Sequence, residues 1–168
     1  MQEILDRVKQ EAGELEQECV LRAKDHFVAC GRWDRIHLFL GIPTTLIAGI
    51  TSVAAMSDIV TKFGYDKDIV SGVLALIVAG LTALTTFLNP SERATAHKTA
   101  SSTYDIIRMK SNLLKDIDLS VNYASLDEPT KEIIKQLKEI TNQFSALGQS
   151  SPRVPRSIYN TNRSPQNS

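Results

Sequence analysis

The feature that most constrains this chain is a pair of long stretches without a charged residue, separated by a short polar segment. Residues 38–57 read LFLGIPTTLIAGITSVAAMS, and residues 69–89 read IVSGVLALIVAGLTALTTFLN. As helices, each stretch would extend roughly 30 Å, which is the thickness of the hydrocarbon core of a bilayer. Buried helices of soluble proteins rarely run this far without a charge. The sequence therefore predicts an all-α membrane protein with a two-helix transmembrane hairpin over residues 38–89 and long cytosolic helices before and after it.

The segment between the two spans, residues 58–68, is too short to form a domain. It contains the basic residues Lys62 and Lys67, whereas the sequences that flank the hairpin contain more positive charge. The flanking basic residues are Arg22, Lys24, Arg32 and Arg35 before the first span, and Arg93, Lys98 and Arg108 after the second. Because positive charge is retained on the cytoplasmic side of a membrane, we expect both termini to lie in the cytoplasm.

Residues 1–37 are expected to form a cytosolic amphipathic helix, because apolar or small residues recur every three or four positions. Cys19 and Cys30 lie on one face of this helix, too far apart to form a disulfide, so we expect them to be buried small residues or else a redox contact between subunits. The apolar stripe favours packing on a partner helix. It consists of Ile4, Val8, Ala12, Leu15, Cys19, Ala23, Phe27, Cys30 and Trp33.

Residues 90–148 are expected to form further cytosolic helices. Asn89 can end the second span, and Pro90 suits the first position of the next helix. A stripe with the same spacing follows, and it predicts an antiparallel, coiled-coil-like pair with residues 1–37. Pro43 is expected to bend the first span, and the Ser-, Pro-, Asn- and Gln-rich residues 149–168 are expected to be disordered. The second stripe consists of Ala94, His97, Ala100, Tyr104, Ile107, Ser111 and Leu114.

The stretches next to the spans resemble a known family. RAKDHFVACGRWDRIHLFLGIPTTLIAGI leads into the first span, and FLNPSERATAHKTASSTYDIIRMK leaves the second. Both are similar to the SLATT family, the effector domain with two transmembrane helices that associates with SMODS and SLOG proteins. The resemblance covers about residues 15–120. It rests on Leu-Gly-Ile-Pro at 40–43, on Asn89-Pro90, and on the spacing of His97 and Tyr104.

This resemblance implies a pore-forming effector in bacterial conflict or anti-phage defence, placed in the inner (cytoplasmic) membrane. It also implies a partner that senses phage or makes a nucleotide signal, such as a SMODS-type nucleotidyltransferase or a SLOG sensor. Some members of the family have an enzyme or sensor domain fused to the membrane domain. This sequence shows none, so we expect the partner to be a separate protein.

Small residues four positions apart predict packing faces in the spans, either within the hairpin or between copies of the chain. Because two helices cannot enclose a water-filled path, a pore requires a homo-oligomer in the lipid bilayer. The expected packing or pore-lining residues are Gly41, Thr45 and Gly49 in the first span and Gly72, Ala75, Ala79, Gly80 and Ala83 in the second. The span threonines are expected either to line a pore or to bond back to their own helix. They are Thr44, Thr45, Thr51, Thr82, Thr85 and Thr86.

His37 and His97 are expected to face each other just below the membrane, as a pH-sensing or metal-binding pair or as a hydrogen-bonded contact between helices. The sequence has no phosphate-binding glycine loop, no metal-spaced Cys/His cluster and no nucleophile elbow, so we expect no enzyme activity, cofactor or metal. Its formal net charge of +0 does not favour a nucleic-acid partner. Two functions remain open: a pore-forming effector, or a non-conducting anchor or scaffold for a cytosolic partner.

Overall fold

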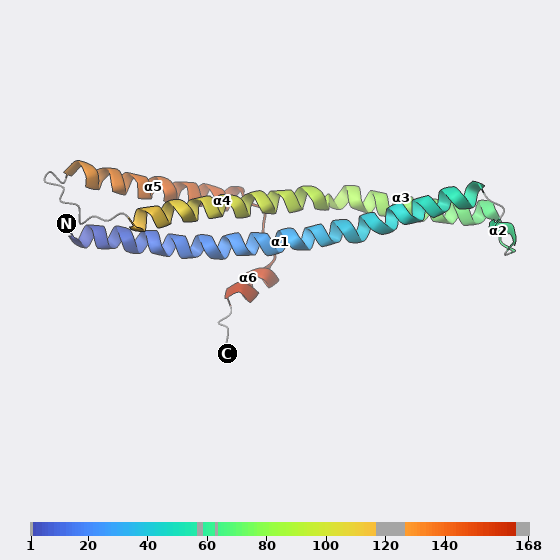
Figure 1. Cartoon of the computed structure of the whole chain (residues 1–168), viewed down its shortest axis with the longest axis horizontal. Helices are drawn as coiled ribbons and strands as arrows, with labels where there is room; N and C mark the ends of the chain where they lie inside the picture. Colours follow the sequence, from blue (N-terminus) through green and yellow to red (C-terminus); the bar gives the residue numbers. More distant parts are fainter. Residues whose placement is uncertain (1, 57–58, 63, 117–126, 164–168) are drawn as a thin grey trace. The chain divides into compact units, whose positions relative to one another are not determined.

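The computed structural model describes residues 2–56, 59–62, 64–116 and 127–163, and every regular element in these ranges is an α-helix. The chain divides into two compact units. Unit 1 comprises Met1–Cys30 and Thr95–Ser168, and unit 2 comprises Gly31–Ala94. The predicted all-α class is confirmed. The helices are α1 (Gln2–Met56), α2 (Ile59–Lys62), α3 (Lys67–Leu88), α4 (Pro90–Asp116), α5 (Asp127–Ser150) and α6 (Arg156–Arg163) (Figure 1).

Within unit 1, α1 and α4 run side by side in opposite directions. The Lys115 ammonium lies 2.6 Å from the Glu16 carboxylate, and the Ser101 hydroxyl donates to the Ala23 carbonyl at 2.9 Å. Residue numbers thus fall along α4 as they rise along α1, which is the antiparallel pairing that the two stripes predict.

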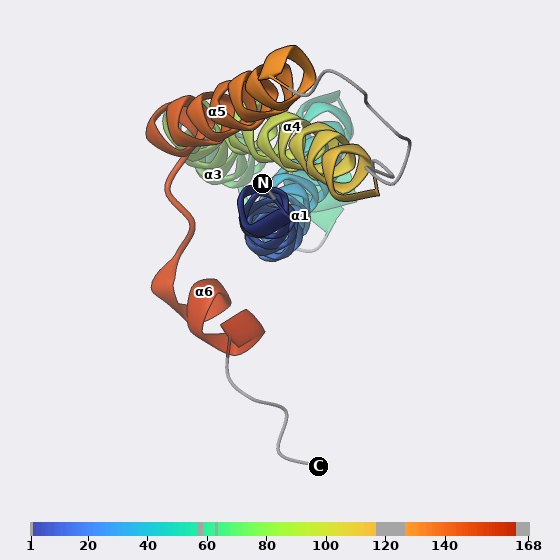
Figure 2. The same cartoon turned by 90° about the vertical axis from the view of Figure 1, so that its left-hand side faces the viewer.

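The third helix of unit 1, α5, packs on α4 (Figure 2). Lys110 donates a hydrogen bond of 2.9 Å to the side-chain oxygen of Gln143, and the Tyr104 ring meets the Phe144 ring edge-on. Tyr104 also lies beside Gly148, so α5 runs antiparallel to α4. Unit 1 is therefore a three-helix bundle.

The core of this bundle forms where the apolar faces of the helices meet. Fully burying one Leu, Ile or Val side chain stabilises a fold by about 1.5–3 kcal/mol. Every residue of the predicted α4 stripe is buried, from Ala94 to Leu114. The core cluster consists of Val8, Ala12, Cys19 and Ala23 from α1, Tyr104, Ile107 and Leu114 from α4, and Leu137 and Ile140 from α5.

The buried face of α1 departs from the predicted stripe after Ala23. Phe27 is 72% exposed, whereas His26 is buried, so the face continues three residues beyond Ala23 rather than four. Because successive residues of a helix are 100° apart, both His26 and Phe27 lie near the face of Ala23. His26 is the one that contacts α4, through His97. At the other end of the predicted stripe, Ile4 is also exposed.

The helix α1 continues through Pro43, so the bend expected at this residue would lie inside one continuous helix rather than between two helices. Proline removes one backbone donor but does not end a helix whose neighbouring turns keep their hydrogen bonds. The predicted boundary between residues 37 and 38 is therefore not a helix boundary.

The junction between α3 and α4 falls where the sequence predicts it. Asn89 takes a left-handed conformation (φ 41°, ψ 56°), and its backbone N–H donates to the Thr85 carbonyl at 3.0 Å. Its side-chain amide donates to the Glu92 carboxylate, and Pro90 begins α4. Asparagine tolerates this conformation better than most residues, which explains its place at the junction.

Two segments differ from the expectations of the sequence analysis. The connection expected over residues 58–68 contains the short helix α2, and α3 begins at Lys67 with Asp66 as its N-cap. The tail expected to be disordered contains α6, which is held in unit 1 by the buried side chain of Ile158 and by the ion pair of Arg163 with Asp25 that is described below. Composition alone misses such a helix because specific contacts, rather than average polarity, stabilise it.

Candidate functional site

A long uncovered apolar surface lies on α3 and on the part of α1 in unit 2. Two helices are long and apolar enough to cross a membrane by length and composition. In the first of these, Asp6–Val53, 6% of the most apolar stretch is buried, and in the second, Lys67–Lys115, 0% is buried. The core helix of a soluble protein is mostly buried. A patch this large needs lipid or protein to cover it. Its exposed residues include Leu46, Ile50, Val53, Ile69, Leu76 and Phe87.

The small residues predicted as packing sites lie on this uncovered surface. A Cβ atom added to any of the four span glycines would meet no described side chain or neighbouring helix within 4 Å. Thr45, Ala75, Ala79 and Ala83 are also exposed. The described side chains of the hairpin therefore do not use these glycines for their own packing. The glycines are Gly41, Gly49, Gly72 and Gly80.

The span threonines bond back to their own helices. The Thr51 hydroxyl donates to the Ile47 carbonyl at 2.7 Å, and the Thr82 hydroxyl donates to the Val78 carbonyl at 2.8 Å. A hydroxyl engaged in this way presents its methyl group outward and offers no free donor. Of the two interpretations left open above, this one matches the geometry. The same kind of bond is made by Thr44, Thr45, Thr85 and Thr86.

A buried histidine pair lies inside unit 1. The Nδ1 atoms of His26 and His97 are 3.0 Å apart, and the two side chains are 3% and 2% exposed. The Tyr104 ring stacks on His26 with 5.5 Å between ring centroids. Since a neutral imidazole has one donor and one acceptor nitrogen, one ring donates its Nδ1 proton to the other. His97 thus pairs with His26 rather than with His37, whose side chain is exposed in unit 2.

Burial, and next the neighbouring His97, lowers the pKa of His26 to about 4, although Asp25 opposes this change. Both causes favour a neutral ring at pH 7 and therefore a hydrogen-bonded contact between helices. Among the residues that the structure describes, no group of three or more His, Cys, Asp or Glu side chains is placed to hold a metal ion.

The helix α6 supplies partners for a buried carboxylate next to this pair. Asp25 is 1% exposed and accepts hydrogen bonds from Arg163 at 2.6 Å and from Asn162 at 2.7 Å. The Arg163 guanidinium also lies over the Tyr159 ring, 3.8 Å from its centroid. Sequence reasoning missed Asp25, Asn162 and Arg163, because nothing in their spacing links residues so far apart in the chain.

Neither cysteine forms a disulfide in the described structure. Cys19 is fully buried, and burial raises the pKa of its thiol to about 12. A thiol in this state is a poor nucleophile, since the thiolate is the reactive form. The structure therefore favours the interpretation of Cys19 as a small core residue.

Comparisons with protein-family models, with curated proteins and with solved structures find no match for this chain. The resemblance to the SLATT family therefore stays a prediction based on the residues that flank the spans.

Proposed function

We propose that this chain is an oligomeric membrane effector. In this proposal the hairpin of residues 38–89 crosses the bacterial inner membrane, with both termini in the cytoplasm, and copies assemble to form a pore or to disrupt the bilayer. The observation that carries the proposal is the uncovered apolar surface of α3, none of whose residues is buried. The SLATT resemblance supplies the role in anti-phage or conflict defence and the trigger by a separate sensor or nucleotidyltransferase.

The open glycine positions support assembly between copies. Without a hydrophobic driving force in lipid, helices associate by close backbone approach at small residues. Gly72 and Gly80 have no described neighbour within 4 Å of an added Cβ, so a helix from another copy has room to approach there. Unit 1, the cytosolic bundle of this proposal, offers the surface on which a separate partner acts.

The test is leakage of dye and ions from liposomes that contain the purified protein. We expect Ala79→Leu with Gly80→Leu to abolish leakage and to reduce assembly, because the added side chains keep the helices apart. The matched control is Ala79→Gly with Gly80→Ala, which changes the same two positions but keeps them small, since a Cβ added at Gly80 meets nothing within 4 Å, and it should leak as the native chain does. Unchanged assembly and leakage in the Ala79/Gly80 variant would contradict the packing face.

A non-conducting membrane anchor or scaffold is the second candidate function. The observation in its favour is that the threonine hydroxyls of both spans bond to their own helices, which leaves span surfaces with few free polar groups. Replacing residues 38–89 by an unrelated hairpin separates the two functions. An anchor keeps its activity in cells after this exchange, whereas a pore-forming effector loses it.

A further inference from the structure

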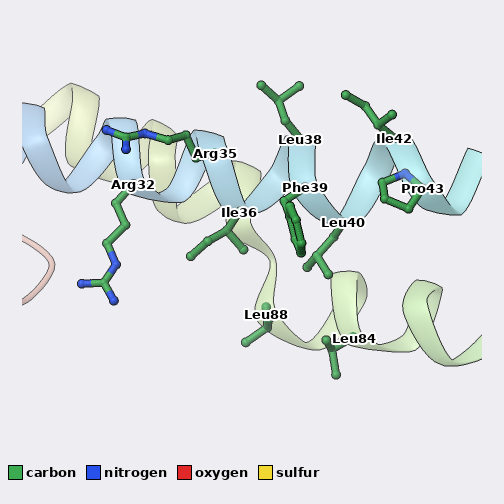
Figure 3. A pocket seen from close by; sticks show the side chains of 10 residues that line it. All are labelled: Arg32, Arg35, Ile36, Leu38, Phe39, Leu40, Ile42, Pro43, Leu84 and Leu88. Atoms are coloured by element: carbon green, nitrogen blue, oxygen red, sulfur yellow. The ribbon is translucent and has the colours of Figure 1, made fainter.

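An apolar groove with arginines at one end lies within unit 2. It has a volume of about 800 Å³ and is formed by α1 around residues 32–43 and by the last turns of α3. In Figure 3, Phe39 and Leu40 of α1 point toward Leu84 and Leu88 of α3. Ligand pockets of proteins typically have volumes of about 300–1,000 Å³. The groove is therefore large enough for an amphiphilic molecule.

The two arginines give the groove a positive end. Arg32 and Arg35 line it one helical turn before the apolar residues, and no lining residue is acidic. Both side chains are exposed, and neither forms an ion pair with a carboxylate of the described residues. A guanidinium binds phosphate oxygens through two parallel hydrogen bonds, and its long stem can lie along apolar surface.

Apolar side chains next to the arginines are exposed to an unusual degree. Phe39 is 80% exposed and Leu38 is 56% exposed, although both line the groove. A water-soluble anion would occupy the arginines and leave these side chains uncovered. An acyl chain would cover them. Arg93 adds to the charge of unit 2, with its guanidinium 4.9 Å from the centre of the Trp33 ring.

We propose that this groove binds an anionic phospholipid. Its phosphate lies between Arg32 and Arg35, and one acyl chain lies along Phe39, Leu40 and Leu84. The proposal rests on the membrane insertion proposed above. A span from a second copy fits the groove less well, because residues 38–57 and 69–89 contain no acidic residue to meet the arginines.

The test is native mass spectrometry of the full chain in neutral detergent, titrated with phosphatidylglycerol and with phosphatidylcholine of the same acyl chains. Each basic side chain beside an anionic lipid contributes about 1 kcal/mol, or roughly fivefold in affinity. We therefore expect phosphatidylglycerol to bind more tightly than phosphatidylcholine by between about tenfold and 30-fold. Inorganic phosphate, which tests the headgroup alone, should not displace the bound lipid.

Two pairs of variants locate the binding site. Arg32→Gln with Arg35→Gln should remove the preference for phosphatidylglycerol, whereas Lys131→Gln with Lys138→Gln, on exposed positions of α5, should keep it. Leu84→Trp fills the groove and should weaken binding of both lipids. Leu76→Trp, at an exposed position of α3 outside the groove, should not.

Flotation of the same variants with vesicles separates this proposal from the membrane insertion on which it rests. A native chain that fails to float contradicts insertion itself. A chain that floats but binds both lipids equally, or keeps its preference without the two arginines, overturns the lipid site alone. So does a Leu84→Trp variant that changes the oligomeric state while its lipid preference is unchanged, since a second copy would then occupy the groove.

Discussion

At the residue scale, unit 1 keeps its most polar buried groups in one place. His26 and His97 satisfy each other through their Nδ1 atoms, and Asp25 is satisfied by Arg163 and Asn162. A buried polar group that loses its partner costs about 1–3 kcal/mol, and a charged one costs more. Each of these contacts therefore makes the stability of unit 1 sensitive to a small chemical change.

The first such change is protonation of His26. Its pKa of about 4 in the folded chain lies below the ordinary value of 6.5, so between these pH values the unfolded chain binds a proton that the folded chain does not. The free energy of unfolding is therefore highest above pH 6.5 and falls as the pH drops toward 4, by at most about 3 kcal/mol. Urea unfolding of the protein in detergent at several pH values measures this loss.

A His26→Gln variant is the comparison for that measurement. Glutamine keeps one donor and one acceptor but does not titrate, so this variant should lose much of the pH dependence between 6.5 and 4. Carboxylates titrate in the same pH range in both proteins, so their contribution cancels when the free energies of unfolding of the two proteins are subtracted. Equal slopes in the two proteins would contradict the assignment of the low pKa to His26.

The second change is loss of the partner of Asp25. Arg163→Gln leaves a carboxylate that is 1% exposed without its cation, and we expect the free energy of unfolding to fall by about 2–4 kcal/mol. Thermal unfolding followed by circular dichroism measures the effect. The control is Lys135→Gln, whose ion pair with Glu132 is exposed and should contribute less than about 0.5 kcal/mol. If Asp25→Asn, combined with Arg163→Gln, does not recover stability, the buried charge is not the cause.

At the element scale, hydrophobic periodicity identified the helices and the buried face of α4. It failed where two neighbouring positions were both compatible with the face, because His26 rather than Phe27 contacts α4 and no local rule favours a polar residue there. It also failed for α6, whose stability comes from Asp25, distant in sequence. Hydrophobic periodicity describes the faces of a single helix. The burial of His26 and the stability of α6 depend instead on contacts with side chains of another helix.

The junction between α3 and α4 gives a prediction at this scale. Asn89 has a φ of 41°, which costs an ordinary residue with a Cβ about 1–2 kcal/mol but costs glycine little. We expect Asn89→Ala to lower the free energy of unfolding by about 1 kcal/mol more than Asn89→Gly does. Unfolding in sodium dodecyl sulfate titrations, followed by circular dichroism, measures both variants. Equal stability of the two would show that the left-handed conformation is not maintained.

At the scale of the whole molecule, the chain combines a bundle with a buried core and a unit with almost none. Unit 1 contains the core cluster, whereas α3 in unit 2 has no buried residue. Urea acts by solvating buried surface, so it should unfold unit 1 first and leave helical structure in residues 31–94 when detergent covers them. Hydrogen exchange followed by mass spectrometry at rising urea tests this order. Simultaneous exchange of both units would contradict it.

The candidate site divides in the same way. The two apolar helices and their small residues were predictable, since composition and spacing alone define them. The groove beside Phe39 and the pairing of His97 were not, because each requires knowing which side chains two helices bring together. The α1 side of the groove was nevertheless visible in the sequence, as the apolar run from Leu38 to Pro43 that follows Arg32 and Arg35 closely.

The division of unit 1 into Met1–Cys30 and Thr95–Ser168 has a consequence for biosynthesis. At about 5–20 residues per second, a ribosome completes α6 several seconds or more after it has made the first segment. Residues 31–94, with both apolar helices, emerge in that interval. In the membrane insertion proposed above, the N-terminal part of α1 therefore waits without its partners while the hairpin enters the membrane, and the bundle closes last.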